Sequence, residues 1–306
     1  MSTSTRGTPS PVDPLGVRFR SEGSAQPALL SRLIDDAAVF PPGLAPLSQA
    51  VSDHLSRSRY AGLVGPLVIP ATAAGEVAAL ASASGRSTPL RVTLVARPGS
   101  PSETVRAGVE RLAVEPAVEV VGVEVGWSTD WRHLQDLGVP MAVEVPREGH
   151  DDVIADVGAG ARAGRAAGAP MVQAKFRTGA TPTWARPDER ELARFLLGCV
   201  DHQLAVKLTG GLHHAVRGEY AASGHREPQH GLLNVLAAVG SALYGEQEDK
   251  VVSLLAERNP GALVALVSGL SAGEARSVRA CFTAYGCCTV TDPISELVAL
   301  GLVGEE

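Results

Sequence analysis

Aromatic residues and positive charge are both scarce in this chain. Phe, Trp and Tyr make up 4% of its 306 residues, and the formal net charge is −6. Proteins that bind nucleic acids usually carry a basic patch or stripe, and many of them stack bases on aromatic rings. The composition therefore argues against a nucleic-acid partner.

Long apolar runs are missing as well. No run approaches the roughly twenty apolar residues that span a bilayer, which argues against a membrane partner. The first 27 residues begin MSTSTRGTPSPVDPLG; they are rich in Ser, Thr and Pro and lack the apolar core of a secretory signal. We expect residues 1–27 to form a flexible tail.

Cysteine is rare too. The chain has four cysteines, Cys199, Cys281, Cys287 and Cys288, and none of them has a Cys-x-x-Cys spacing. This usage favours reduced thiols in a cytoplasmic protein over a disulfide framework or a zinc site. The doublet at positions 287 and 288 is interpreted as packing residues, with a cysteine nucleophile as the lesser alternative.

Near-continuous apolar runs alternate with helical patterns from residue 63 onward. The runs are LVGPLVIP (63–70), LRVTLVA (90–96), VEVVGVEV (118–125), VPMAVEV (139–145), MVQAKF (171–176) and LAVKL (204–208). Such runs are typical of parallel strands buried on both faces. Six in succession predict a (β/α)8 TIM-like barrel, which we expect residues 28–306 to form as a single domain. No Gly-x-Gly-x-x-Gly loop follows the first run, which argues against a dinucleotide-binding fold.

The pattern is less regular at both ends of the barrel. The spacing predicts N-terminal helices over residues 28–40 and 47–60, so that Asp35 and Asp36 either end a helix or form part of a lid. About seventy residues separate position 208 from the last expected strand at 281–290, more than one crossover needs. We therefore expect an insertion there. Either a seventh strand is hidden within it, with residues 263–270 as a candidate, or the barrel is irregular.

Lysine is the rarest charged residue and has an unusual distribution. The chain has 3 lysines and 24 arginines, and two of the lysines lie in matched settings, VQAKFRTGA (172–180) and AVKLTGGLHHAV (205–216). Lys175 and Lys207 would end consecutive barrel strands, where active-site side chains converge. We expect mutual repulsion and desolvation to lower the pKa of one of them. A neutral amine can attack a carbonyl and form a Schiff base, whereas arginine stays protonated.

These two stretches resemble the lysine motifs of deoxyribose-phosphate aldolase and its class I aldolase relatives. The resemblance implies a Schiff-base lysine at the end of strand six, matched by Lys175 with Thr178 and Gly179. It implies a second lysine at the end of strand seven, matched by Lys207 with Gly210 and Gly211. YGCCTV (285–290) is loosely similar to the phosphate-binding turn of that family. No organic cofactor is implied, because the iminium itself accepts the electrons.

The resemblance covers about a quarter of the chain, and several features depart from it. Arg177 and the doublet His213-His214 are outside the pattern of that family, and residues 217–279 have no counterpart there. The acidic residue of the family has no matching Asp; the nearest candidates are Glu124 and Glu144. We therefore interpret the chain as a divergent bacterial relative and do not transfer the substrate.

Two glutamates and one arginine are further candidates near strand ends. Glu124 and Glu144 interrupt apolar strands, where a carboxylate needs a partner; each is either an ion-pair partner of a lysine or a general acid or base. Arg177 lies two residues after Lys175, so both side chains would point the same way. Its guanidinium suits a substrate carboxylate or phosphate, or a structural ion pair.

Half of the histidines fall within eighteen residues, at His213, His214, His225 and His230. We expect His213 or His214 to transfer protons or to bind substrate. His230 and Asn234 are four residues apart and would share a helix face toward the substrate, although His230 could equally cap that helix. The spacing matches no familiar metal motif, so no metal is assigned.

The leading hypothesis is a cytoplasmic lyase that forms or cleaves a carbon–carbon bond through a lysine Schiff base. Its partner would be a small aldehyde or keto substrate, with an anionic group as an option. One alternative is a metal-dependent lyase or isomerase that uses His213, His214 and His230. The other is a non-catalytic binder that holds a small anion through Lys175, Arg177 and Lys207. The sequence leaves the oligomeric state open, a homo-oligomer included.

Overall fold

A computed structural model of the chain describes residues 26–181, 184–222 and 225–305. The expected N-terminal tail therefore lies outside the described residues except for its last two positions, which begin the first helix. Among the described residues, no helix combines the length and the apolar character that a membrane span requires.

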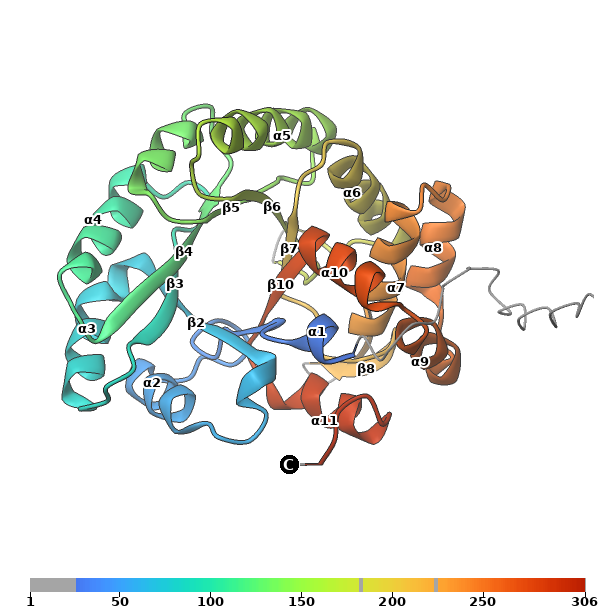
Figure 1. Cartoon of the computed structure of the whole chain (residues 1–306), viewed down its shortest axis with the longest axis horizontal. Coiled ribbons are helices and arrows are strands. Elements are labelled where there is room, and N and C mark those ends of the chain that lie inside the picture. Colours follow the sequence, from blue (N-terminus) through green and yellow to red (C-terminus); the bar gives the residue numbers. More distant parts are fainter. Residues whose placement is uncertain (1–25, 182–183, 223–224, 306) are drawn as a thin grey trace, which may run out of the picture.

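Eight parallel strands close into a barrel in the order β1-β10-β7-β6-β5-β4-β3-β2 (Figure 1), which confirms the predicted (β/α)8 TIM barrel. The strands are β1 (Ile34–Asp36), β2 (Val64–Pro70), β3 (Leu90–Val95), β4 (Val118–Gly126), β5 (Met141–Glu144), β6 (Val172–Arg177), β7 (Val206–Thr209) and β10 (Phe282–Cys287). Their apolar runs are buried from both sides, by the barrel interior and by the helices outside.

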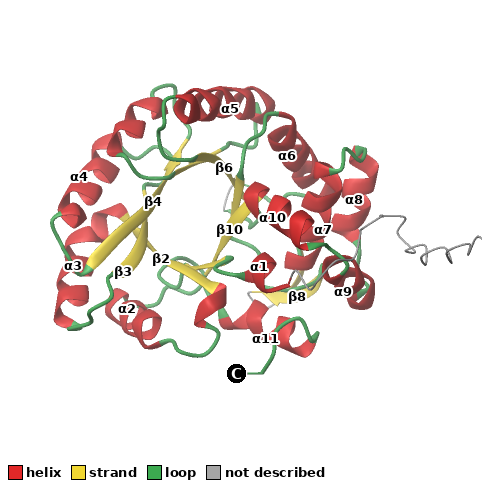
Figure 2. Ribbon diagram, viewed as in Figure 1, coloured by secondary structure: helices red, strands yellow, loops and turns green. Residues whose placement is uncertain are grey.

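Helices surround the strands, as Figures 1 and 2 show. They are α1 (Gln26–Leu30), α2 (Leu47–Ser56), α3 (Ala74–Ala83), α4 (Ser102–Ala113), α5 (His150–Ala166), α6 (Glu189–Asp201), α7 (Leu232–Leu243), α8 (Glu248–Ala256), α9 (Pro260–Ser268), α10 (Ala272–Cys281) and α11 (Thr291–Ala299). A short 3-10 helix, Trp131–Leu137, connects β4 to β5. The amphipathic sequences place their apolar stripes on the sheet, for example Leu192, Phe195 and Leu196 of α6.

The N-terminal part of the barrel differs from the prediction. The first helix ends at Leu30, and Ile34–Asp36 form β1, so the helix expected over residues 28–40 is wrong beyond its first turn. Strand β1 closes the barrel because Ile34 pairs with Tyr285 of β10 on one side and with Val64 of β2 on the other. The strand that completes the set of eight is therefore β1, before β2 in the chain, and does not lie in the long segment after β7.

The expected insertion before the last strand is confirmed. It consists of an antiparallel hairpin, β8 (Gly218–Ala222) and β9 (His225–Gln229), followed by α7 to α10. Residues 263–270, suggested as a strand, belong mainly to α9. The Asn259 side chain accepts a hydrogen bond from the Gly261 amide at 2.9 Å, and Pro260 occupies the first turn, so the helix begins there.

Candidate active site

Five charged side chains meet inside the barrel, at or near the carboxyl ends of its strands. They are Asp35 on β1, Glu124 on β4, Glu144 on β5, Lys175 on β6 and Lys207 on β7, and we call them the lysine–carboxylate cluster. All are buried except Glu144, whose side chain is 13% exposed. Four of these residues were predicted from the sequence to act at the site, and Asp35 was not.

Glu124 lies between the two lysines. Its Oε2 is 2.8 Å from Lys175 Nζ, and its Oε1 is 2.6 Å from Lys207 Nζ. Lys175 Nζ also contacts Glu144 Oε2 at 2.8 Å, and Lys207 Nζ donates a hydrogen bond to Asp35 Oδ2. Negative and positive charges therefore alternate along the cluster, which is how buried charges are tolerated.

This pairing reverses the predicted effect on the lysines. Burial by itself lowers the pKa of Lys175, but Glu124 and Glu144 raise it more, and the net pKa is above its ordinary value. The pKa of Lys207 is raised in the same way by Asp35 and Glu124, against the effect of burial. The expectation that repulsion would lower one lysine pKa is wrong, because a carboxylate separates the two amines.

The carboxylates of the cluster differ in pKa. Burial favours the protonated form of Glu124, but its two lysine partners outweigh burial and hold its pKa at about 2. For Asp35, burial prevails over the attraction of Lys207, so its pKa is raised. Asp35 is therefore the carboxyl group of this pair that more readily holds a proton.

Two glycine turns align the lysine strands. Lys175 is directly opposite Lys207 in the β6–β7 register, and the Thr178 amide donates to the Thr209 carbonyl at 2.8 Å. A Cβ on Gly179 would lie 1.5 Å from the Gly210 carbonyl oxygen, so the two turns touch backbone to backbone. The Thr-Gly parts of both motifs are thus explained by close packing of the turns.

The Asp35-Asp36 doublet is divided between two environments. Asp35 points to Lys207, whereas Asp36 contacts His54 Nδ1 at 3.0 Å and Arg57 at 3.6 Å. A Cβ on Gly65 of β2 would lie 2.0 Å from Asp35 Oδ1, so only glycine leaves room for this carboxylate. The interpretation of the doublet as a helix end or a lid is therefore wrong. The sequence did contain a signal, because Gly65 within an apolar strand indicates that another group approaches the backbone closely there.

A cavity of about 360 Å³ adjoins the cluster. Its lining comes from the segments that follow β3, β5 and β6, and it includes Glu144, Arg147, Phe176, Arg177 and Trp184. Glu144 belongs to both the cavity and the cluster, so it connects the cavity to Lys175. Arg177 Nε lies 3.7 Å from Glu144 Oε1, and its side chain is 40% exposed. Such a volume suits a small molecule.

The histidine-rich segment is not brought together as one site. His213 lies against Cys287 and Cys288, with its ring nitrogens 3.7 and 3.6 Å from the two sulfur atoms. His214 Nδ1 contacts Glu296 at 2.7 Å, and its ring stacks on Tyr220.

His230 and Asn234 have structural partners. His230 Nε2 is 2.8 Å from the Pro187 carbonyl oxygen, and the Asn234 amide donates to the carbonyls of Leu254 and Glu257. Within the described residues, no group of three or more His, Cys, Asp or Glu side chains has the geometry to hold a metal ion. A substrate-binding role for these two residues stays a prediction that no contact supports.

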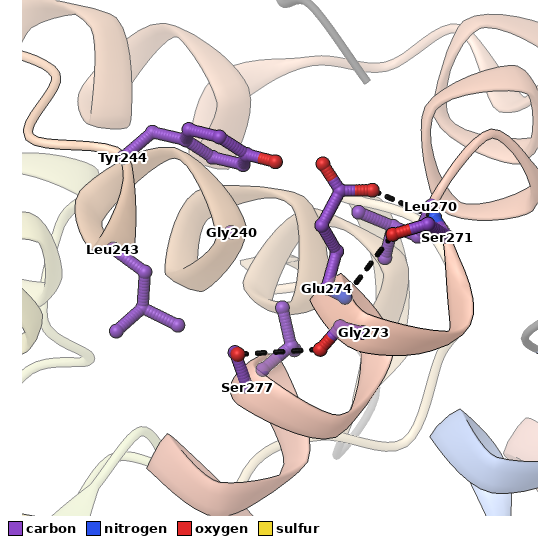
Figure 3. Close-up of a pocket in the computed structure, with 9 residues that line it drawn as sticks. Gly240, Leu243, Tyr244, Leu270, Ser271, Gly273, Glu274 and Ser277 are labelled. Atoms are coloured by element: carbon purple, nitrogen blue, oxygen red, sulfur yellow. Dashed lines mark hydrogen bonds between the residues drawn. The ribbon is translucent and has the colours of Figure 1, made fainter. Parts of the chain in front are cut away.

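A larger cavity, of about 470 Å³, lies on the outside of the barrel between α7 and α10 (Figure 3). It contains none of the cluster residues. Its polar groups serve α10: the Ser271 side chain accepts from the Glu274 amide, and the Glu274 carboxylate accepts from the Ser271 amide. These groups form a capping box. We therefore place the candidate site at the lysine–carboxylate cluster.

Comparison with known proteins identifies no family for this chain. No protein-family model matches the chain, and a search of curated proteins finds no match. Among solved structures, the chain is similar to a dihydropteroate synthase of Xanthomonas albilineans at 13% identity and a TM-score of 0.33, over 89% of this chain and 93% of that one. At these values the likeness supports no argument about function. A functional hypothesis must therefore rest on the lysine–carboxylate cluster and its cavity.

Proposed function

We propose that this barrel is a lyase that forms or cleaves a carbon–carbon bond through a Schiff base on Lys175. The observation that carries the proposal is the contact of the buried Lys175 Nζ with Glu144, whose carboxylate also lines the 360 Å³ cavity. A carbonyl compound in that cavity would meet an amine and a proton acceptor together. Strands β6 and β7 are also the sixth and seventh strands of the barrel, as the resemblance to deoxyribose-phosphate aldolase implies.

Because the pKa of Lys175 is raised, its ammonium group must first lose a proton. Glu144 accepts that proton, and the neutral amine then attacks the carbonyl carbon to give a carbinolamine. The protonated Glu144 returns its proton to the carbinolamine hydroxyl, which leaves as water, and the iminium forms on Nζ. Glu144 ends as a carboxylate beside the cationic iminium, so charge and protons balance. In aldol cleavage the same carboxylate takes the proton of the substrate hydroxyl as the carbon–carbon bond breaks.

Lys207 and Glu124 position the reacting amine in this proposal. Glu124, which is not part of the cavity lining, holds Lys175 Nζ at 2.8 Å, and Lys207, anchored by Asp35, fixes Glu124 in turn. The role of His213 in proton transfer stays a prediction, since the contacts in the described ranges join it to Cys287, Cys288 and Asp292 and not to the cluster.

Reductive trapping tests the proposal directly. The protein is incubated with a panel of small aldehydes and keto acids and treated with borohydride, and its peptides are mapped by mass spectrometry. We expect labelling of Lys175, its loss in Lys175→Arg, and no change in Lys250→Arg, which alters the remaining lysine, on α8. Labelling of Lys207 in its place would contradict the assignment to Lys175. No labelling by any member of the panel would exclude Schiff-base chemistry.

A non-catalytic anion binder is the second candidate, and the raised pKa of both lysines favours it because both carry charge at neutral pH. The two functions differ in their response to Lys175→Arg. Arginine keeps the positive charge, so a binder retains most of its affinity for a carboxylate ligand in calorimetry. The lyase loses all covalent labelling, since a guanidinium forms no imine.

A further inference from the structure

Arg177 lines the cavity, and its guanidinium has hydrogen-bond donors without acceptors among the described residues. Its closest carboxylate, Glu144, is 3.7 Å from Nε, beyond good hydrogen-bond length, and within the described ranges no hydrogen bond reaches its guanidinium. The guanidinium lies over the turn after β7, because a Cβ on Gly210 would be 2.8 Å from Nη1. With a side chain that is 40% exposed, it has donors available for a bound anion.

The other arginine of the cavity is already engaged. Arg147 Nη2 contacts the Glu191 carboxylate, with Oε2 at 2.6 Å, and Nη1 donates to the Ala185 carbonyl. Its guanidinium also lies 5.5 Å from the ring centre of Trp184. Of the two arginines in this lining, Arg177 is therefore the one placed to recognise a substrate anion.

Arg177 and Lys175 lie close together, so an anion bound by Arg177 would be close to a carbonyl group that reacts with Lys175. One carboxylate, that of Glu144, contacts Lys175 Nζ with Oε2 and faces Arg177 Nε with Oε1. A single carboxylate therefore lies within reach of both the amine and the guanidinium. The two residues are also two apart on β6, so their side chains project to the same side of the strand.

We propose that the carbonyl substrate is a 2-oxo acid whose carboxylate pairs with Arg177 while its keto carbon bonds to Lys175 Nζ; this inference rests on the proposed Schiff-base function. In a 2-oxo acid the carboxylate is bonded directly to the keto carbon, so one small group presents both functions to two residues that already share one carboxylate. Arg177 is therefore the specificity-determining residue of the cavity.

The charges of the cluster accommodate this substrate. Asp35, Glu124 and Glu144 are balanced by Lys175, Lys207 and Arg177 in the free protein. The substrate adds one negative charge, and the Lys175 iminium keeps the positive charge of the ammonium. The added charge faces Arg177, whose 3.7 Å contact with Glu144 is the longest of these pairs.

Borohydride trapping with a matched pair of probes tests the inference. Pyruvate and acetone share a methyl ketone and differ in whether the other substituent is a carboxylate or a methyl group. We expect half-maximal labelling of Lys175 at a pyruvate concentration at least about tenfold below that of acetone, since a charge-assisted pair with Arg177 contributes that much. Arg177→Gln should remove the preference, and Arg177→Lys should restore part of it. Arg91→Gln, which changes a surface arginine of β3 paired with Glu119, should leave it intact.

The outcomes separate the two proposals. Equal labelling of Lys175 by pyruvate and acetone overturns the 2-oxo acid inference and leaves the Schiff-base function standing. A pyruvate preference that survives in Arg177→Gln overturns the assignment to Arg177. Absence of labelling by both probes, and by the wider panel of carbonyl compounds, overturns the Schiff-base function and this inference with it.

Discussion

Glu124 is the residue on which the charge balance of the barrel interior depends most, and Glu124→Gln tests this directly. The substitution keeps the shape of the side chain and removes its charge. Lys175 would then retain only Glu144, and Lys207 only Asp35, as carboxylate partners in the cluster. Both ammonium groups would remain buried with less compensation.

The expected magnitude follows from the pKa of Glu124. The two lysines and burial together shift it from 4.5 to about 2, and each pKa unit corresponds to about 1.4 kcal/mol. The carboxylate form is therefore stabilised in the folded protein by about 3 kcal/mol relative to the unfolded chain. Breaking a buried ion pair in other proteins costs about 3–5 kcal/mol, which is consistent with this value. We expect Glu124→Gln to lower the free energy of unfolding by about 3 kcal/mol at pH 7.

The sign of the pH dependence is also fixed. The folded pKa is below the unfolded one, so the stabilisation is fully present above pH 4.5 and is lost as the pH falls from 4.5 toward 2. The difference in stability between the wild type and Glu124→Gln should therefore narrow below pH 4.5.

Urea unfolding followed by circular dichroism measures both effects. Glu119→Gln is the matched control, because Glu119 is on the same strand and its ion pair with Arg91 is exposed; we expect a change of less than about 0.5 kcal/mol. If Glu124→Gln unfolded at the same urea concentration as Glu119→Gln, the account of the cluster as a set of mutually dependent buried charges would be refuted.

Two further predictions concern Asp35 and Lys175. Gly65→Ala should displace Asp35, because the new Cβ would lie 2.0 Å from its Oδ1, and should lower the free energy of unfolding by about 1–3 kcal/mol in thermal or urea unfolding. The control is Gly75→Ala in α3, where a Cβ has open space around it, and this change should be neutral or stabilising. Equal effects of the two substitutions would show that the contact between Gly65 and Asp35 is not tight. Because the pKa of Lys175 is raised, the fraction of its neutral amine grows about tenfold per pH unit between pH 7 and 10. The initial rate of borohydride trapping on Lys175 should therefore rise over that range. A plateau beginning near pH 7 would show that the amine is already neutral there.

The strands with short, near-continuous apolar runs were predictable from the sequence, and so were the two lysines and two glutamates near their ends. β6 and β7 are almost entirely buried, and their motifs place Lys175 and Lys207 side by side. The pairing of the lysines through Glu124 was not predictable, because it depends on the curvature of the barrel, which brings β4 across from β7.

Asp35 was missed for a different reason. Strand β1 has three residues, too few to show alternation, and Leu29, Leu30, Leu33 and Ile34 around it follow a helical spacing. Only the pairing with β10 and β2, which are distant in sequence, makes the segment a strand. Helix α9 was missed although the sequence contains a signal for it. Asn259 and Pro260 are typical of a helix start, and they outweigh the strand-like composition of the residues that follow.

The contact between the turns after β6 and β7 has a consequence for how this cavity can be altered. Gly179 and Gly210 leave no space for a side chain between the two loops, so an insertion or a bulkier residue in one loop must be accompanied by a change in the other. In the loops after β3 and β5, which supply Pro98 and Pro146 to the cavity wall, a Cβ at Gly99 or Gly149 would have nothing within 4 Å. Diversification or redesign of the cavity should therefore accumulate in those two loops, while the loops after β6 and β7 vary only as a pair.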